Sequence, residues 1–265
     1  MPRAAIVTFL LSLAVGSASA QTDYYNIDAG RPITVEDAYP VERHAFELHL
    51  APLRLWRSAG TYTWALEPEL AYGLLPRTQL EVGLPLVYAD PREGPRSTGV
   101  AGLDVGVLHN LNVETRTLPA FGVAAELLAP VGSLAPDRAY LSLKGIATRT
   151  WSLARLHLNG AYTLGDSPGE ESAGHDLARW TAGAAVDHAF PLQSVLVTAE
   201  LVAEGPMVDD ATTEWRTGAG LRWQRTPRLA LDVGGGVRLN GGERPWYLTF
   251  GGAYAFAFRS LIPVR

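Results

Sequence analysis

Apolar and polar residues alternate one by one along most of the chain from about residue 43 onward. The last run shows the pattern most clearly, because Trp246, Leu248 and Phe250 share one parity while Thr249 and Gly251 share the other. A period of two indicates an extended strand whose two faces meet different surroundings. About twelve such runs begin near residues 44, 61, 78, 99, 119, 140, 153, 178, 194, 213, 228 and 246. A spacing of roughly 20 residues fits transmembrane strands of about 10 residues joined by hairpins.

The middle of each apolar face carries no charged residue. A lipid-facing surface would enforce this, because an arginine or lysine at the bilayer midplane costs roughly 2–4 kcal/mol. The opposite parity holds the charges, and they fall into two sets. In the first five runs the mid-strand charges on this parity are all acidic, namely Glu47, Glu67, Glu69, Glu81, Asp104 and Glu126. In the later runs bases dominate, namely Lys144, Arg155, Arg179, Arg216, Arg222, Arg228 and Arg238, with Asp187, Glu200, Glu214 and Asp232 among them.

Alternation alone does not tell which face points outward, since a soluble sandwich would bury the apolar parity and solvate the charged one. Three features favour the membrane. Connections alternate between tight ones (74–77, 112–116, 150–152, 191–194, 225–228) and longer ones (89–97, 130–138, 165–176, 205–211, 240–245). The polar parity is rich in glycine and alanine, which suits a crowded lumen, and aromatic residues gather near strand ends, as at membrane interfaces. We therefore predict an all-β fold, a closed antiparallel transmembrane barrel of about 12 strands.

Three prolines fall inside the first runs, at Pro52, Pro68 and Pro85. A proline in a closed barrel removes a ladder hydrogen bond, so we expect a bulge or a shortened strand at each of them.

The first twenty residues have the pattern of a cleaved signal peptide. Arg3 precedes an apolar stretch from Ala4 to Gly16, and the small residues before Gln21 suit a signal peptidase. The stretch is too short for a membrane helix, which needs roughly 20 apolar residues, and no later segment qualifies. We expect residues 1–20 to be the signal peptide, 21–42 a periplasmic segment or one tucked into the barrel mouth, and 43–265 the barrel.

Composition narrows the functional classes. The chain of 265 residues has 22 basic and 27 acidic side chains, a net charge of −5, and no cysteine. It therefore has neither a disulfide framework, nor thiol catalysis, nor a cysteine-ligated metal. Mild acidity and a single lysine make nucleic acid an unsuitable partner. His49 and His157 point inward without companions at metal-ligand spacing, so no cofactor or metal is expected.

The segments AGRPITVEDAYPVERHAFEL (29–48) and ELAYGLLPRTQLEVGLPLVY (69–88), with the final aromatic strand, resemble the outer-membrane family named for the meta-pathway of phenol degradation. The resemblance covers roughly residues 38–258. It implies an outer-membrane channel or transporter of a Gram-negative bacterium, and the final strand resembles the signal by which the barrel assembly machinery recognises its clients. Here residues 259–265 follow Phe258, where many clients end on the aromatic residue.

Two hypotheses describe the lumen. Closing the sheet sets a mainly acidic wall across from a mainly basic one, and the field between them could orient and screen small polar or amphipathic solutes. Alternatively the walls pair and plug the interior, because twelve strands lie between filled eight-strand barrels and open larger ones. Residues 21–42 are either an ordered lead-in or a gate.

Enzymatic alternatives have less support. His44, His109 and His188 lie on the lipid parity at periplasmic strand ends, the wrong leaflet for a lipid-cleaving pair. His175-Asp176 and Asp209-Asp210 lie in expected outer loops, where acids are more often solvated or bridged by cations to lipopolysaccharide. We expect a passive porin-like channel for small, including aromatic or amphipathic, solutes and not an enzyme. A plugged structural or adhesive barrel is the alternative, and an outer-membrane hydrolase comes third.

Overall fold

The computed structural model describes residues 25–50, 53–58, 60–167, 177–207, 212–241 and 244–258. The expected signal peptide lies outside these ranges, as do His175-Asp176, Asp209-Asp210 and the tail after Phe258. In the described ranges the regular structure is strand, apart from one 3-10 turn, η1 (Pro191–Gln193). None of their helical segments is long and apolar enough to cross a membrane.

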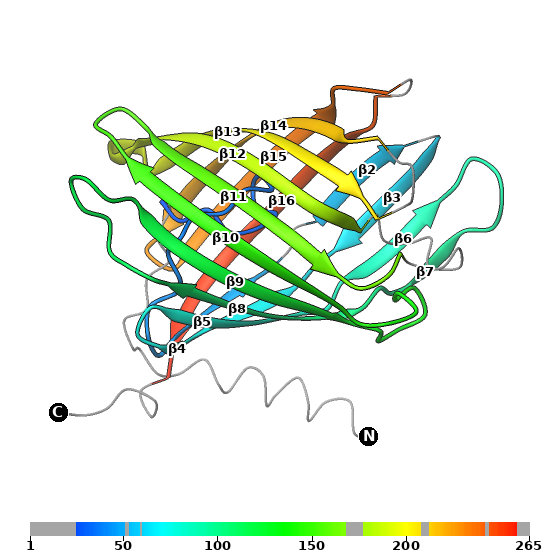
Figure 1. Cartoon of the computed structure of the whole chain (residues 1–265), viewed down its shortest axis with the longest axis horizontal. Coiled ribbons are helices and arrows are strands. Elements are labelled where there is room, and N and C mark those ends of the chain that lie inside the picture. Colours follow the sequence, from blue (N-terminus) through cyan, green and yellow to red (C-terminus); the bar gives the residue numbers. More distant parts are fainter. Residues whose placement is uncertain are drawn as a thin grey trace.

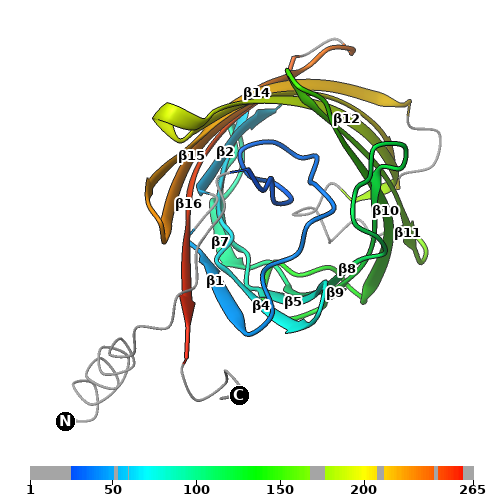
Figure 2. The ribbon, with the colours of Figure 1, turned by 90° about the vertical axis from the view of Figure 1, so that its left-hand side faces the viewer.

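The strand segments of the described residues form a single sheet that closes on itself (Figures 1 and 2). Each segment pairs antiparallel with its neighbours, and β1 pairs with β16 to close the barrel. The first eight segments are β1 (Ala45–His49), β2 (Leu53–Ser58), β3 (Thr61–Leu66), β4 (Glu69–Leu75), β5 (Thr78–Gly83), β6 (Leu86–Asp90), β7 (Ser97–Val100) and β8 (Leu103–Asn110). The others are β9 (Ala120–Ala129), β10 (Tyr140–Thr150), β11 (Arg155–Leu164), β12 (Ala178–Phe190), β13 (Val195–Pro206), β14 (Glu214–Thr226), β15 (Leu229–Arg238) and β16 (Trp246–Ala257).

These segments make twelve barrel strands, because the first eight are four strands that are each interrupted once. β1 and β2 both pair with β16, and the pairs β3/β4, β5/β6 and β7/β8 follow in the same way. Within the described residues the interruptions lie at 67–68, 84–85 and 101–102, with a fourth between His49 and Leu53, and Pro68 and Pro85 each sit in one, whereas Pro52 lies outside the described residues. The predicted barrel of about 12 strands is confirmed, with the expected shortening at Pro68 and Pro85.

The faces of the strands are inverted relative to a soluble protein. On the apolar parity, Leu143, Leu158 and Leu201 are 49%, 47% and 43% exposed. On the polar parity, Thr148 and His157 are fully buried. A soluble sandwich would show the opposite, because its apolar parity would form the core. Exposed apolar side chains on strand after strand are the surface that a bilayer requires.

One connection differs from its prediction. The turn expected to be tight at 112–116 is a loop over residues 111–119, between β8 and β9. Asn112 holds it, donating to the carbonyl of Pro119 (2.7 Å) and accepting the amide of Phe121 (2.9 Å). Arg149 also donates to the carbonyl of Thr115 at 2.6 Å. These side-chain bonds replace ladder bonds that Pro119, which has no N–H, cannot make.

Residues 25–44, here termed the plug, run through the interior of the barrel (Figure 2). Ile27, Ile33 and Val35 are buried against Leu196 and Val202 of β13. Residues 25–42 of the segment expected at the periplasm or the barrel mouth thus contact the barrel interior, and residues 21–24 lie outside the described residues.

Candidate functional site: the barrel lumen

Side chains of the barrel bind main-chain groups of the plug. Glu200 of β13 accepts the amides of Thr34 and Val35 at 2.9 and 3.0 Å. Asn159 of β11 accepts the amide of Glu36 and donates to its carbonyl, both at 2.9 Å. These bonds satisfy main-chain groups that would otherwise be buried without partners. The barrel therefore holds the plug through main-chain hydrogen bonds from its lumen side chains.

Buried ion pairs fix residues 26–31 of the plug. Arg222 of β14 contacts Asp28 at 2.7 Å and Asp232 of β15 at 3.5 Å, and it donates to the carbonyl of Asn26. Arg31 contacts Asp28 at 2.6 Å. Both arginines are almost completely buried, so their charges require these carboxylates. Burial alone would raise the pKa of Asp28, but the guanidinium groups of Arg222 and Arg31 outweigh it and hold that pKa well below its usual range.

The predicted basic wall is largely neutralised by carboxylates beside it. Arg155 pairs with Asp187 at 2.8 Å and lies 3.8 Å from Asp37 of the plug. Two further pairs join Arg216 to Glu204 and Arg238 to Glu214. Positive and negative groups of this wall therefore cancel locally and do not pair across the lumen.

Two residues assigned to the basic wall lie near its ends. Arg179, the second residue of β12, donates to the carbonyls of Thr163 and Gly165. Arg228 lies in the turn between β14 and β15, not in the middle of a strand, so that assignment is corrected. The run starting near 228 begins one residue later, at Leu229, which leaves Arg228 at the barrel end.

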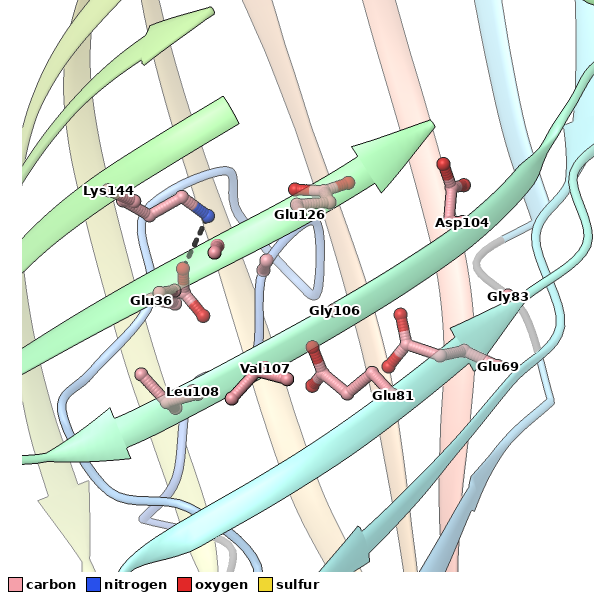
Figure 3. Close-up of a pocket in the computed structure, with 13 residues that line it drawn as sticks. Glu36, Glu69, Glu81, Gly83, Asp104, Gly106, Val107, Leu108, Glu126 and Lys144 are labelled. Atoms are coloured by element: carbon pink, nitrogen blue, oxygen red, sulfur yellow. Dashed lines mark hydrogen bonds and ion pairs between the residues drawn. The ribbon is translucent and has the colours of Figure 1, made fainter. Parts of the chain in front are cut away.

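The acidic wall borders a cavity that the plug leaves open (Figure 3). Its empty space is about 440 Å³, part of it open to solvent. Glu69, Glu81, Asp104 and Glu126 line it from four neighbouring strands, and Glu36 of the plug completes the ring. Lys144 of β10, expected in the basic wall, lies in this same cavity and forms an ion pair with Glu36. In the described residues, no ion pair joins those four wall carboxylates to an arginine.

The other two acids of the predicted wall lie outside this cavity. Glu47 is buried beside His49, whose Nε2 is 3.1 Å from its carboxylate, and the Nδ1 of His49 is 2.7 Å from Glu69. Glu67 lies between β3 and β4, 3.8 Å from Arg54. The structure thus brings together four of the six predicted acids.

One cluster has the composition of a metal site. Asp28, Glu47 and His49 each offer a ligand atom, and these atoms lie within 4.8 Å of one another. However, the same carboxylate oxygen of Asp28 contacts the guanidinium groups of Arg31 and Arg222. Two adjacent positive charges oppose a cation there, so the cluster is an ion-pair network.

The lipid-parity histidines make no hydrolase-like pair in the described residues. His109 Nδ1 is 2.9 Å from the hydroxyl of Thr78, and His188 contacts the carbonyl of Leu153 and packs edge-on against Phe190. The two ring nitrogens of His44 have no hydrogen-bond partner. The other expected candidates, His175-Asp176 and Asp209-Asp210, are outside the described residues.

Sequence reasoning missed the residues that hold the plug. Gln79, Asn110, Thr148 and Asn159 lie on the polar parity, which a strand pattern does reveal. Which of the lumen side chains contact residues 25–44 depends on the path of an irregular segment, and no periodicity encodes that path.

A family model described as "Putative MetA-pathway of phenol degradation" matches residues 59–256. This match covers three quarters of the chain. The chain belongs to this family. A search of curated proteins finds no significant match.

Solved structures of similar fold agree with this membership of the phenol-degradation family. An outer-membrane channel from Pseudomonas putida F1, titled COG4313, is 14% identical, with a TM-score of 0.61 over 87% of this chain and 100% of the other. The KdgM porin is 13% identical, with a TM-score of 0.52 over 80% of this chain and 99% of the other. Both are outer-membrane barrels, and at these identities they establish the shared fold.

Proposed function

We propose that this member of the phenol-degradation family is a passive outer-membrane channel for small polar or amphipathic solutes, and that it prefers cations. The observation that carries the proposal is the cavity between the plug and β4, β5, β8 and β9 (Figure 3). Residues 27–35 of the plug pack on β13–β15, residues 38–44 cross to β5, β8 and β10, and the cavity that remains lies along the acidic wall, where solutes would pass.

The balance of charges in the lumen supports the proposed preference for cations. The arginines of β11, β14 and β15 are matched by neighbouring acids or by Asp28 of the plug. Among the described residues that line the cavity, Lys144 is the only base, and it is paired with Glu36. A narrow low-dielectric pathway lined by carboxylates that no arginine neutralises raises the local concentration of cations and repels anions. An amphipathic solute with an ammonium group would meet the same field.

Planar-bilayer conductance under a KCl gradient tests this proposal. We expect the sign of the reversal potential to report cations as the more permeant ions. The double variant Glu81→Gln/Glu126→Gln should bring the permeability ratio toward one. Asp166→Asn is the matched control, because Asp166 is exposed in the loop after β11. We expect this variant to leave the permeability ratio unchanged. An anion preference in the unaltered protein would contradict the proposal.

A structural barrel without transport is the second candidate, and the plug itself favours it. A 12-stranded barrel has limited interior space, and residues 25–44 take up much of it. Absence of channel openings from protein that shows heat-modifiable migration on a gel would support this candidate and remove the channel.

The outer surface of the barrel suggests which molecules it would contact in the membrane. The apolar belt would contact outer-membrane lipid, and extracellular loops such as 130–139 would meet lipopolysaccharide. On the barrel exterior Phe256 stacks on Phe46 with ring centroids 5.3 Å apart, and Phe258 packs edge-on beside them. We propose this final strand as the part that the barrel assembly machinery engages.

A further inference from the structure

Residues 27–37 of the plug form a self-contained loop, here termed the plug loop. Ile27 and Asp37 close it, because the amide of Asp37 donates to the carbonyl of Ile27 at 3.0 Å and the Asp37 carboxylate accepts the Ile27 amide at 3.1 Å. Inside it, the amide of Arg31 donates to the carbonyl of Asp28 at 3.0 Å, and their side chains pair. The loop can therefore keep its shape when it moves.

The plug loop docks on several strands through contacts that belong to no strand ladder, and among them Glu36 pairs with Lys144 of β10 and bonds to Asn159 of β11. Glu200 accepts the amides of Thr34 and Val35, and Arg222 pairs with Asp28. Arg54 of β2 donates to the carbonyl of Gly30 at 3.0 Å. Releasing these contacts breaks no strand pairing, since β1 remains bonded to β16 and β4.

Residues 38–44, the plug root, are anchored separately and on other strands. Ala38 is bracketed by Thr148, which accepts its amide at 3.1 Å, and Asn110, which donates to its carbonyl at 2.9 Å. Gln79 accepts the amide of Val41 at 2.6 Å, and the amide of His44 donates to the carbonyl of Gly73 at 2.8 Å. The two parts of the plug thus meet at the link between Asp37 and Ala38.

We propose that the plug loop undocks from β10–β15 and from β2 as one body, pivoting at Asp37–Ala38 while the plug root stays bound, and that this movement opens the wide state of the channel. The inference rests on the proposed channel function. Undocking would add the space beside β12–β15 to the cavity along the acidic wall. Glu200 and Arg222 are the latch, because each binds the plug loop and neither contacts the plug root.

The absence of cysteine allows the pivot to be tested with single disulfides in the full-length chain. A Cβ placed on Gly183 would lie 4.0 Å from the Cβ of Val35, and one on Gly122 would lie 3.4 Å from the Cβ of Ala38. Both distances are close to those that disulfides span. Val35→Cys/Gly183→Cys therefore ties the plug loop to β12, and Ala38→Cys/Gly122→Cys ties the plug root to β9.

We expect oxidation of Val35→Cys/Gly183→Cys to abolish the large-conductance openings in a planar bilayer and reduction to restore them. Oxidation of Ala38→Cys/Gly122→Cys should leave those openings in place. Equal openings in the oxidised and reduced forms of the first variant would overturn the inference while the channel function stands. Loss of openings in the second variant alone would place the moving part in the root and overturn it too.

A latch variant tests the inference without any disulfide. Glu200→Gln removes the charge that accepts two plug amides, so we expect the population of the wide state to rise about tenfold. Glu204→Gln is the control, since Glu204 lies on the same strand and pairs with Arg216. Equal open populations in the two variants overturn the inference. If no variant, including Glu200→Gln, shows channel openings, the channel function itself is overturned.

Discussion

At single lumen positions, the absence of a side chain makes room for the plug. Gly183, Gly220 and Gly234 face it, and a Cβ on Gly220 would come within 2.6 Å of the Cβ of Pro32. A Cβ on Gly234 would overlap the carbonyl oxygen of Pro32, which cannot move independently of the plug backbone. The glycine-rich polar parity of the sequence therefore has a specific cause in this lumen.

Gly234→Ala should displace the plug from its seat on β15 while the barrel still folds. We expect larger single-channel conductance and unchanged heat-modifiable migration. Gly160→Ala is the control, because a Cβ there meets no atom within 4 Å. Conductance equal to that of the control would show that the plug does not limit the pathway.

Asp37 makes docking of the plug sensitive to pH. Burial raises its pKa to about 6, although Arg155 and His157 face it and act in the opposite direction. The docked state thus holds a proton more tightly than the released state, in which the carboxyl returns to its ordinary range. Docking is strongest at low pH and weakens as the pH rises through about 6.

We therefore expect the wide state to become less populated when the pH falls from 7 to 5. Asp37→Asn should remove most of this dependence, while the remaining groups around it, Arg155, His157 and Asp187, are unchanged. The measurement is the open probability of both proteins in a bilayer across this pH range. An open probability that rises on acidification, or an identical dependence in Asp37→Asn, would contradict the assignment.

At the scale of elements, the interrupted strands set one part of the barrel apart. β1 to β8 are four strands broken near the same level, whereas β9 to β16 are continuous for 10 to 13 residues. At the breaks single bonds bridge the gaps, such as the Leu84 amide to the carbonyl of Pro68 and the Ala101 amide to that of Pro85, both near 3 Å. Fewer ladder bonds mean lower local stability.

Amide hydrogen exchange of the folded protein in detergent should reveal this difference. We expect the amides beside the breaks, at Glu69, Leu86 and Leu103, to exchange faster than those in the middle of β10 and β13. The breaks lack continuous ladders, so local opening there requires less free energy. Uniform protection around the barrel would show that the prolines do not weaken it.

Strand positions could be predicted from the sequence because the bilayer imposes a period of two on every strand. The twelve expected starts lie within two residues of those observed, for example Tyr140 and Trp246. The loop at 111–119 was predicted too short, because the side chains of Asn112 in the loop and of Arg149 on β10 replace backbone pairing that no alternation signals. Breaks were expected only at the prolines, and no such signal is present in the sequence at Ala101-Gly102. The break there is caused by the positive φ of Gly102.

At the scale of the whole molecule, two opposed charged walls were expected, and the structure shows a third charged part, the plug, in the same lumen. The acids of the first strands line the cavity, the bases of the later strands are matched locally, and the plug lies between them. The sequence showed the segregation of charge because parity places each residue in the lumen. It could not show that the chain's own residues 25–44 run through the lumen, since that segment has no period and its contacts are long-range.

Cysteine accessibility at two neighbouring positions tests the central claim, that the apolar face meets lipid and the charged face meets enclosed water. Glu126 and Leu127 are adjacent on β9 and both are exposed, on opposite faces. In protein folded into lipid vesicles, we expect a charged, membrane-impermeant thiol reagent to modify Glu126→Cys and to leave Leu127→Cys unmodified. A fluorophore at position 127 should be quenched by brominated lipid tails. Modification of Leu127→Cys together with a protected Glu126→Cys would contradict the account.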